Sequence, residues 1–467
     1  MFLPPLLSGV LHAISIHLPL AGVLGVVALA PLMFQARQNL GRSDRVKTAL
    51  LYGSCYGLLT QLWVLDSAAL IEGGLSGETA LYFFGLTLAT SIHGVASALS
   101  IHFVMRLLAD RTELAVLVLP LALVFLEFLQ MQIWLDTLPW VTLPIGYVLG
   151  PLTPLIQPAA IGGVWLVSYL AYTINCLLAR AVHLGTGSSR LHLGAMLALW
   201  PLVGFWMQYL TSIERDHESL RVALLLDDVS HEPWSDANGN QRAERILSLA
   251  SEIGKAGPID LVLWSETAIP WIFQTDDDLV AYALRNASGA SAYHLIGTKF
   301  EEVGSGNVFN AALLINSDGA ISDMHQKTQP LPFLETEMLG FLATSRAGQS
   351  IKQAKAVEPI TVKEKRLGVG ICNEWMRASF ARILSSRGAQ AFVNLSNNNY
   401  FRWPMMKVQH LNYSRFRCVE NRLAMAVNNN LGFSGWIDRS GQFHAYTPVE
   451  NTLESGERLT LYLPVVN

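Results

Sequence analysis

Cysteine is scarce in this chain: four residues in 467 are too few for a disulfide framework, and no spacing among them fits a zinc site. Cys55 and Cys176 lie in apolar segments, while Cys372 and Cys418 lie in the more polar second half. Cys418 falls on an expected helix, where packing explains it. If the second half faces an oxidising compartment, an unpaired Cys372 is better explained by reactivity than by crosslinking.

Charged residues are also scarce in the first half. Residues 1–210 hold eight Lys or Arg and eight Asp or Glu, which leaves 24 basic and 28 acidic side chains for the rest of the chain. The net charge of −4 gives no basic excess, which argues against nucleic acid as a partner. A chain of this length should contain more than one domain. We therefore predict a transmembrane domain at residues 1–213 and a soluble domain at residues 214–467.

Seven long apolar runs account for the low charge of the first half. A helix needs about 20 apolar residues to cross a bilayer, and six of the seven runs reach that length. The first run is short and contains Pro4 and Pro5, so we expect it to pair with the second as a hairpin. The chain should thus open with a multi-span α-helical membrane domain of about seven helices. The runs occupy about residues 2–14, 16–34, 47–71, 78–106, 113–134, 154–184 and 191–213.

The basic residues of the first half follow a topological pattern. They fall in three loops, at residues 37–47, 106–111 and 180–190, while the loops near residues 72–78 and 135–153 contain none. Loops rich in Lys and Arg stay in the cytoplasm. The second half is therefore expected on the opposite face, which in a Gram-negative cell is the periplasmic side of the inner membrane.

The second half alternates between expected strands and helices, a pattern typical of a layered α/β domain. The strands are expected at residues 221–226, 260–264, 294–298, 310–316, 366–372, 391–396 and 424–429. The helices are expected at residues 238–255, 277–287, 376–387 and 405–422.

Three stretches of this α/β region present groups suited to covalent acyl chemistry. An apolar strand delivers Cys372 to a strand-to-helix turn, a similar strand ends beside Glu266, and Lys327 lies in a Pro-rich loop that ends at Glu335. The carboxylate can remove the thiol proton, the thiolate can attack a carbonyl, and the ammonium can stabilise the oxyanion. A lone Cys is more often a small buried hydrophobic residue, so the other two stretches carry much of this interpretation.

In the order Glu, Lys, Cys, the stretches DLVLWSETAIPW, HQKTQPLPFLE and RLGVGICNEWMRASF resemble the nitrilase superfamily, and the resemblance runs from about Arg221 onward. The membrane half, from Leu126 through its Pro-Trp and Gly-Tyr turns, looks like the membrane domain of bacterial apolipoprotein N-acyltransferases. The resemblance implies that the soluble domain is a nitrilase-like α-β-β-α sandwich.

The resemblance also assigns roles to individual residues. Glu266 matches the catalytic base, Lys327 the oxyanion-stabilising lysine, and Cys372 the nucleophile. Glu335 matches a second essential carboxylate, although it could serve only to orient the lysine. Glu374 matches a glutamate specific to the acyltransferases, although a Glu at a helix start also stabilises the helix dipole.

The implied reaction transfers an acyl chain from a phospholipid, through a Cys thioester, to the N-terminal cysteine of a lipoprotein or another amine, with no cofactor or metal. Trp234 falls where the family has a tryptophan near the lipid entrance, and a packed aromatic explains it equally well. We expect mobile loops at residues 331–345 and 397–405 to cover the site.

The sequence departs from the family pattern around the expected site. Ser265 stands in place of a proline, Asn373 in place of a tyrosine, and SNNNYF at residues 396–401 in place of the commoner Ser-Asn-Asp-Gly-Trp-Phe. Such changes bear on substrate choice. Similar membrane nitrilases occur among plasmid conjugal-transfer proteins, so the acceptor could differ from a lipoprotein. A nitrilase-type amidase and a non-enzymatic membrane scaffold are the other interpretations.

Overall fold

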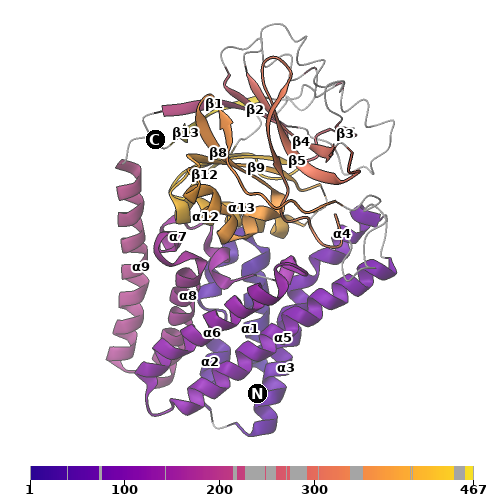
Figure 1. Cartoon of the computed structure of the whole chain (residues 1–467). Coiled ribbons are helices and arrows are strands. Elements are labelled where there is room, and N and C mark those ends of the chain that lie inside the picture. Colours follow the sequence, from indigo (N-terminus) through magenta and orange to yellow (C-terminus); the bar gives the residue numbers. More distant parts are fainter. Residues whose placement is uncertain are drawn as a thin grey trace, which may run out of the picture. The chain divides into compact units, whose positions relative to one another are not determined.

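The computed structural model divides into two compact units (Figure 1), with most of residues 1–213 and residues 403–412 in a helical unit and most of the remainder in an α/β unit. The structure describes residues 2–38, 40–72, 76–141, 143–213, 218–226, 244, 248, 259–269, 271–273, 292–302, 304–336, 351–399, 401, 403–445 and 458–465. The expected helices at 238–255 and 277–287, Trp234, and residues 337–345 of the first expected loop lie outside these ranges, apart from single helical residues at 244 and 248.

The first unit is helical throughout. Four of its helices, α5, α6, α8 and α9, are long and apolar enough to cross a membrane. In chain order the helices are α1 (Leu3–His17), η1 (Pro19–Val26), α2 (Ala30–Ala36), α3 (Arg42–Gln61), α4 (Trp63–Glu72), α5 (Gly77–Leu107), α6 (Thr112–Trp134), η2 (Pro139–Val141), η3 (Ile145–Leu149), α7 (Thr153–Ile156), α8 (Ala159–Leu184) and α9 (Gly187–Ile213).

Two of the expected spans differ from the structure. The run at 16–34 is divided into the 3-10 helix η1 and the short helix α2, and the run at 47–71 is divided between α3 and α4. Helix α3 begins at Arg42, so its first turns carry charged residues that lower its mean hydropathy. Beyond the four long helices, the number of times that the chain crosses the membrane therefore stays a prediction.

Buried polar contacts hold the helical unit together. The carboxylate of Glu127 on α6 accepts hydrogen bonds of 2.7 Å from the N–H of Ile145 and from the hydroxyl of Tyr172, and so joins α6 to η3 and α8. Asn175 on α8 accepts hydrogen bonds from the N–H groups of Leu29 and Ala30 at 2.8 and 3.1 Å. Buried polar groups need such partners because water cannot replace them.

A short piece of the second half of the chain packs within this helical unit. Residues 403–412 include the first part of helix α13 (Pro404–Asn421). The side chain of Gln409 donates to the carbonyl oxygen of Ile16 at 3.3 Å, and His410 stacks on Trp140 with ring centroids 5.6 Å apart. The beginning of α13 is thus part of the helical unit's polar and aromatic packing.

The second unit contains two β-sheets, with strand orders β13-β1-β2-β4-β5-β6 and β12-β11-β10-β9-β8-β7; β3 also pairs with β4. The strands are β1 (Glu218–Leu225), β2 (Leu261–Leu263), β3 (Ile272–Phe273), β4 (Tyr293–Glu301), β5 (Val308–Ile315), β6 (Ile321–Gln326), β7 (Ile360–Val362), β8 (Lys365–Ile371), β9 (Ala391–Asn397), β10 (Met425–Asn430), β11 (Gly435–Ile437), β12 (Phe443–Ala445) and β13 (Arg458–Val465).

The two sheets face each other across one apolar core. Val222 of β1 and Leu263 of β2 belong to the same buried cluster as Val369 and Ile371 of β8 and Val393 of β9. Alternate side chains of a strand point to opposite faces, and the other face of the first sheet builds a second cluster. Helix α12 (Ala378–Ser386) packs against the second sheet through aromatic contacts among Trp375, Phe380 and Phe392. The expected helical membrane domain followed by a layered α/β domain is confirmed.

All seven expected strands are present within a few residues of their expected bounds, and α12 and α13 match two of the expected helices. The remaining strands were not expected. Four of them, β3, β7, β11 and β12, are two or three residues long, too short for an alternating pattern to be visible.

Gly297 lets strand β4 approach the segment that carries Glu266. A Cβ atom at this position would lie 2.3 Å from the carbonyl oxygen of Ser265 and 2.7 Å from the Cα of Glu266. We predict that Gly297→Ala lowers the stability of the α/β unit by about 1–3 kcal/mol and displaces Glu266. Thermal unfolding of the purified protein measures the loss. Gly85→Ala, where a Cβ meets no atom within 4 Å, is the control and should not lower the unfolding temperature.

Candidate active site

Cys372 lies where strand β8 passes into the 3-10 helix η4 (Cys372–Met376). Its φ of +53° is in the left-handed region, which costs energy for a residue with a side chain. The apolar residues of β8 are fully buried, and Cys372 at its end is a partly buried residue. Cys372 thus follows the carboxyl end of the strand, where the turn into η4 begins, as the sequence predicted.

Glu266 follows strand β2 and is 6% exposed. Its Oε1 accepts hydrogen bonds from Asn310 at 2.8 Å and from the ammonium of Lys327 at 3.0 Å, and its Oε2 accepts one from the backbone N–H of Asn397 at 3.0 Å. Burial raises the pKa of Glu266 and Lys327 lowers it, with a net shift above the ordinary value. Glu266 is therefore a stronger base than an exposed carboxylate.

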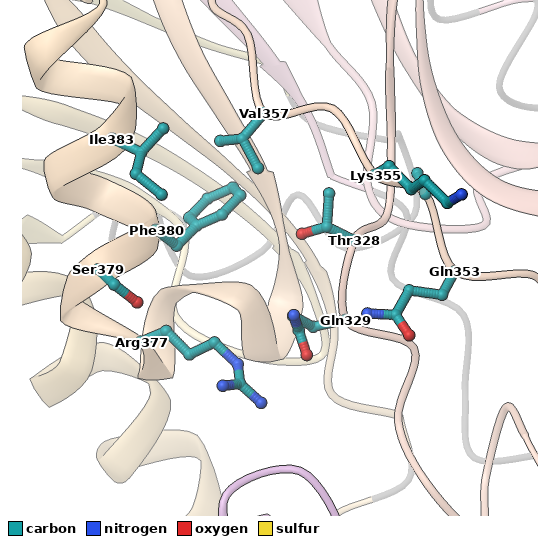
Figure 2. Close-up of a pocket in the computed structure, with 10 residues that line it drawn as sticks. Thr328, Gln329, Gln353, Lys355, Val357, Arg377, Ser379, Phe380 and Ile383 are labelled. Atoms are coloured by element: carbon teal, nitrogen blue, oxygen red, sulfur yellow. The ribbon is translucent and has the colours of Figure 1, made fainter. Parts of the chain in front are cut away.

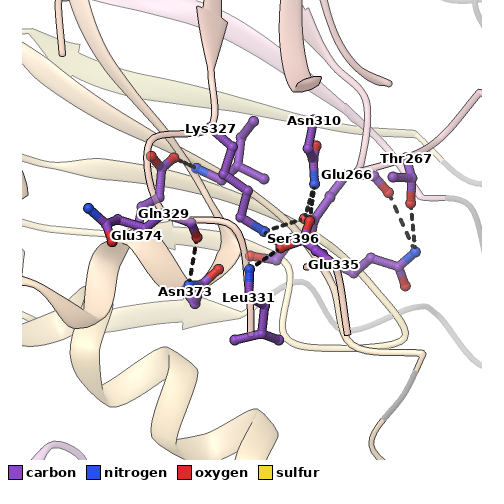
Figure 3. A network of polar contacts seen from close by, with 12 residues as sticks. Glu266, Thr267, Asn310, Lys327, Gln329, Leu331, Glu335, Asn373, Glu374 and Ser396 are labelled. Carbon is purple, nitrogen blue, oxygen red and sulfur yellow. Dashed lines mark hydrogen bonds and ion pairs between the residues drawn. The ribbon is translucent and has the colours of Figure 1, made fainter. Parts of the chain in front are cut away.

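Lys327 follows strand β6 and is 1% exposed. Its Nζ lies 3.0 Å from Glu266 and 2.9 Å from Glu335, so a single ammonium contacts two carboxylates (Figure 3). Burial alone would lower the pKa of Lys327, but the two carboxylates outweigh burial and raise the pKa well above its ordinary value. Lys327 is therefore a permanent positive charge in this site.

Asn310 also joins the carboxylates of Glu266 and Glu335. Its amide nitrogen donates to Glu266 at 2.8 Å and to Glu335 at 2.7 Å (Figure 3), while Glu335 also accepts from the N–H of Leu331 at 2.6 Å. Asn310 was missed in the sequence. The available signal was a single polar residue within a continuous apolar run, which forms the fully buried strand β5.

Cys372 lines the same small cavity as Glu266, Lys327, Glu335 and Asn310. The cavity has a volume of about 60 Å³ and is closed in part by Leu331, Leu334 and Phe401. The sequence predicted that Glu266, Lys327 and Cys372 act together. Although Glu266 and Cys372 are 106 residues apart in the chain, the fold brings all three to one cavity. Within the described ranges, no three His, Cys, Asp or Glu side chains are placed to share a metal ion.

The thiol of Cys372 is neutral in this environment. Burial raises its pKa, Glu266 raises it further, and the opposing charge of Lys327 is not sufficient to bring it down, so the pKa lies well above the ordinary value. A backbone hydrogen bond from Asn373 acts in the direction that favours the thiolate. The geometry therefore suits a thiol that loses its proton to a base during the reaction rather than a resting thiolate.

Glu374 is not among the residues that line the cavity. It hydrogen bonds to the two segments that carry Cys372 and Lys327. Its carboxylate accepts hydrogen bonds from the N–H of Ile371 at 2.8 Å and from the N–H and hydroxyl of Thr328 at 2.7 and 2.6 Å, and pairs with His325 at 2.8 Å. Burial would raise the pKa of Glu374, but these partners lower it. Glu374 thus connects the end of β8 to the loop that carries Lys327.

Two of the departures from the expected pattern have identifiable contacts. The side-chain amide of Asn373 donates to the carbonyl oxygen of Gln329 at 2.9 Å, so it too joins the turn after Cys372 to the Lys327 loop. Asn397 ends strand β9 and contacts Glu266 through its backbone N–H, while its side chain contacts Thr267 at 3.2 Å. Asn397 therefore orients the carboxylate, and the sequence alone did not show this.

Family models match both halves of the chain. The model for the N-terminal domain of apolipoprotein N-acyltransferase matches residues 8–177, and the model for carbon-nitrogen hydrolase matches residues 229–453. An apolipoprotein N-acyltransferase of Geobacter metallireducens is 25% identical over 463 residues, covering 96% of this chain and 87% of that protein. One from Chlorobaculum tepidum is 24% identical over 499 residues, covering 96% of this chain and 88% of that protein.

Two solved structures match about half of the chain. A carbon-nitrogen hydrolase from Helicobacter pylori, 15% identical, has a TM-score of 0.40 and covers 54% of this chain and 90% of its own. A nitrilase superfamily member from Saccharomyces cerevisiae, 17% identical, also has a TM-score of 0.40 and covers 53% of this chain and 90% of its own.

The contacts of Glu374 predict that replacing this residue strongly destabilises the protein. Glu374→Ala leaves His325, Thr328 and the N–H of Ile371 without their buried acceptor, and we expect a loss of about 3 kcal/mol in stability. Thermal unfolding of the purified protein measures it. Glu301→Ala, a partly exposed glutamate on β4, should change stability by less than about 0.5 kcal/mol. Equal unfolding temperatures for the two variants would contradict the role given to Glu374.

Proposed function

The chain belongs to the apolipoprotein N-acyltransferase family of the nitrilase superfamily, and on this premise we propose that it moves an acyl chain from a phospholipid, through a thioester on Cys372, to an amine. The observation that carries the proposal is the presence of Cys372, Glu266 and Lys327 around one cavity. These groups supply a nucleophile, a base and a positive charge, which are the parts that acyl transfer requires.

The first half reaction begins with proton transfer from Cys372 to Glu266. The thiolate then attacks the carbonyl carbon of a phospholipid ester, and Lys327 stabilises the negative oxygen of the tetrahedral intermediate. Asn373 supports this step through its backbone N–H at the sulfur. The C–O bond breaks, the leaving oxygen takes the proton from Glu266, and a lysophospholipid departs.

In the second half reaction an amine attacks the thioester and gives a proton to Glu266. The C–S bond breaks, the sulfur is protonated again, and the product is an amide. The family name supports an amine of an apolipoprotein as the acceptor, and the resemblance of the sequence implies the α-amino group of its N-terminal cysteine. Because both half reactions use one covalent intermediate, they give ping-pong kinetics.

Substrate entry requires movement at the mouth of the cavity. A volume of about 60 Å³ holds about two water molecules, far less than an acyl ester. Leu331, Leu334 and Phe401 lie in the segments expected to act as lids, and their apolar side chains suit the first carbons of an acyl chain. The basic loops of the first half support a periplasmic position for this site.

The covalent intermediate gives a direct test. Full-length protein in detergent, incubated with a phospholipid that carries an alkyne-tagged acyl chain, should form a hydroxylamine-sensitive adduct on Cys372. Cys372→Ala should form none, whereas Cys55→Ala, which removes another partly buried cysteine, should react like the unmodified protein. An undiminished adduct on Cys372→Ala would show that the nucleophile is misassigned.

The acceptor is tested with the same adduct. Addition of a diacylglyceryl-cysteine peptide should discharge the labelled enzyme and give the N-acyl peptide. Discharge to free fatty acid at one rate, with or without the peptide, would instead identify a hydrolase of the amidase type. Failure of Cys372 to react with any activated acyl probe would support the non-enzymatic alternative.

The pKa of Glu266 predicts the pH dependence of the first half reaction. Glu266 acts as a base only when ionised, and its pKa lies above the ordinary 4.5. The rate of adduct formation should therefore fall as pH decreases through a midpoint above 4.5. Because Glu335 contributes to this raised pKa, Glu335→Gln should move the midpoint to lower pH. A rate that stays constant down to pH 4.5 would exclude Glu266 as the base.

A further inference from the structure

A second cavity in the α/β unit has no lining residue in common with the one that holds Cys372. Its volume is about 480 Å³, within the range of about 300–1,000 Å³ found for small-molecule sites. Three segments form its walls: the loop directly after Lys327, residues 353–357, and the start of helix α12. The acyl-transfer mechanism makes no use of this cavity.

The lining of the cavity is positively charged. Arg377 and Lys355 both line it, and none of its described lining residues is acidic. Lys355 is exposed and forms no ion pair with any residue in the described part of the chain. The side-chain amides of Gln329 and Gln353 add hydrogen-bond donors (Figure 2). Two cations and two amides together suit an anion with several acceptor oxygens.

The start of helix α12 adds to this positive character. The helix has nine residues, and its first turn contains no acidic residue. Backbone N–H groups at a helix start lack partners within the helix and carry partial positive charge. Ser379, in this first turn, lines the cavity. A bound anion would provide the acceptor that the helix itself lacks.

One side of the cavity is apolar. Val357, Phe380 and Ile383 lie together on one side in Figure 2, with Gln329 and Arg377 on another. Ile383 is 38% exposed, so its side chain is available to a ligand. The lining is therefore suited to a molecule with a charged end and a small organic group.

We propose that this cavity binds a phosphate monoester with a short organic group. A phosphate carries nearly two negative charges near neutral pH and offers three acceptor oxygens, which matches two cations and several donors better than a carboxylate does. Such a phosphate monoester has two sources, the phosphate headgroup of a membrane lipid and a water-soluble phosphate ester.

The ligand would contact the loop that carries Lys327. Thr328 and Gln329 line the cavity, and both are hydrogen bonded to the turn after Cys372, Thr328 through Glu374 and Gln329 through Asn373. A phosphate bound beside these two residues would contact the same loop that carries Lys327.

Binding is measured on full-length Cys372→Ala protein, so that the result is independent of acyl transfer. The probes are sn-glycerol 3-phosphate and inorganic phosphate, titrated by calorimetry in detergent. We expect saturable binding of both, with the ester binding more tightly. Arg377→Gln and Lys355→Gln should each weaken binding by about tenfold, the effect of removing a charged hydrogen bond. Ile383→Ala should weaken the ester and leave phosphate unchanged.

Two matched controls separate the site from general charge. Lys352→Gln and Arg382→Gln remove exposed cations on the same segment and the same helix that do not line the cavity, and should leave binding unchanged. Nanodiscs of phosphatidylcholine with added phosphatidic acid then distinguish the sources: competition with the soluble probe identifies a lipid headgroup, and no competition identifies a soluble ester. Absence of saturable binding, or equal weakening by the control variants, would overturn the proposal.

Discussion

The candidate site depends on one interaction, the contact of the buried Lys327 ammonium with the carboxylates of Glu266 and Glu335. A buried ammonium is unfavourable unless anions compensate for lost hydration, and two adjacent carboxylates are unfavourable without a cation between them. Each group therefore makes the position of the others possible. Asn310 completes the arrangement by donating to both carboxylates with one amide nitrogen.

This arrangement explains how the site can hold a base and a positive charge in direct contact. Glu335 shares the charge of Lys327, and its own negative charge raises the pKa of Glu266, so Glu266 can still accept a proton. Lys327 meanwhile stays charged because two anions surround it. Glu335 thus contacts Lys327 and, after burial, is among the groups that raise the pKa of Glu266; its role as a second essential carboxylate or as an orienting group stays a prediction.

The sequence predicted the parts of the site that depend on local pattern. Apolar strands that end at Glu266 and Cys372 were visible because burial on both faces requires continuous apolar residues. Asn310 and Asn397 were not recognised, because their partners lie 44 and 131 residues away and are brought close only by strand pairing. Glu374 was predicted to stabilise a helix start or to share in catalysis. The structure contains the helix-start contact, because the carboxylate accepts from the N–H of Ile371 at the start of η4. It also adds partners on segments 46 and 49 residues away, which no local pattern encodes, and the share in catalysis stays a prediction.

The narrowness of the cavity around Cys372 has a consequence for the fate of a thioester formed there. Every acyl-enzyme partitions between two acceptors, and the solvent is present at far higher concentration than any peptide. A chamber with room for about two molecules of solvent admits that competitor even when closed, whereas the peptide needs the mouth to open. How quickly the mouth opens for the peptide therefore decides which acceptor the proposed thioester meets first.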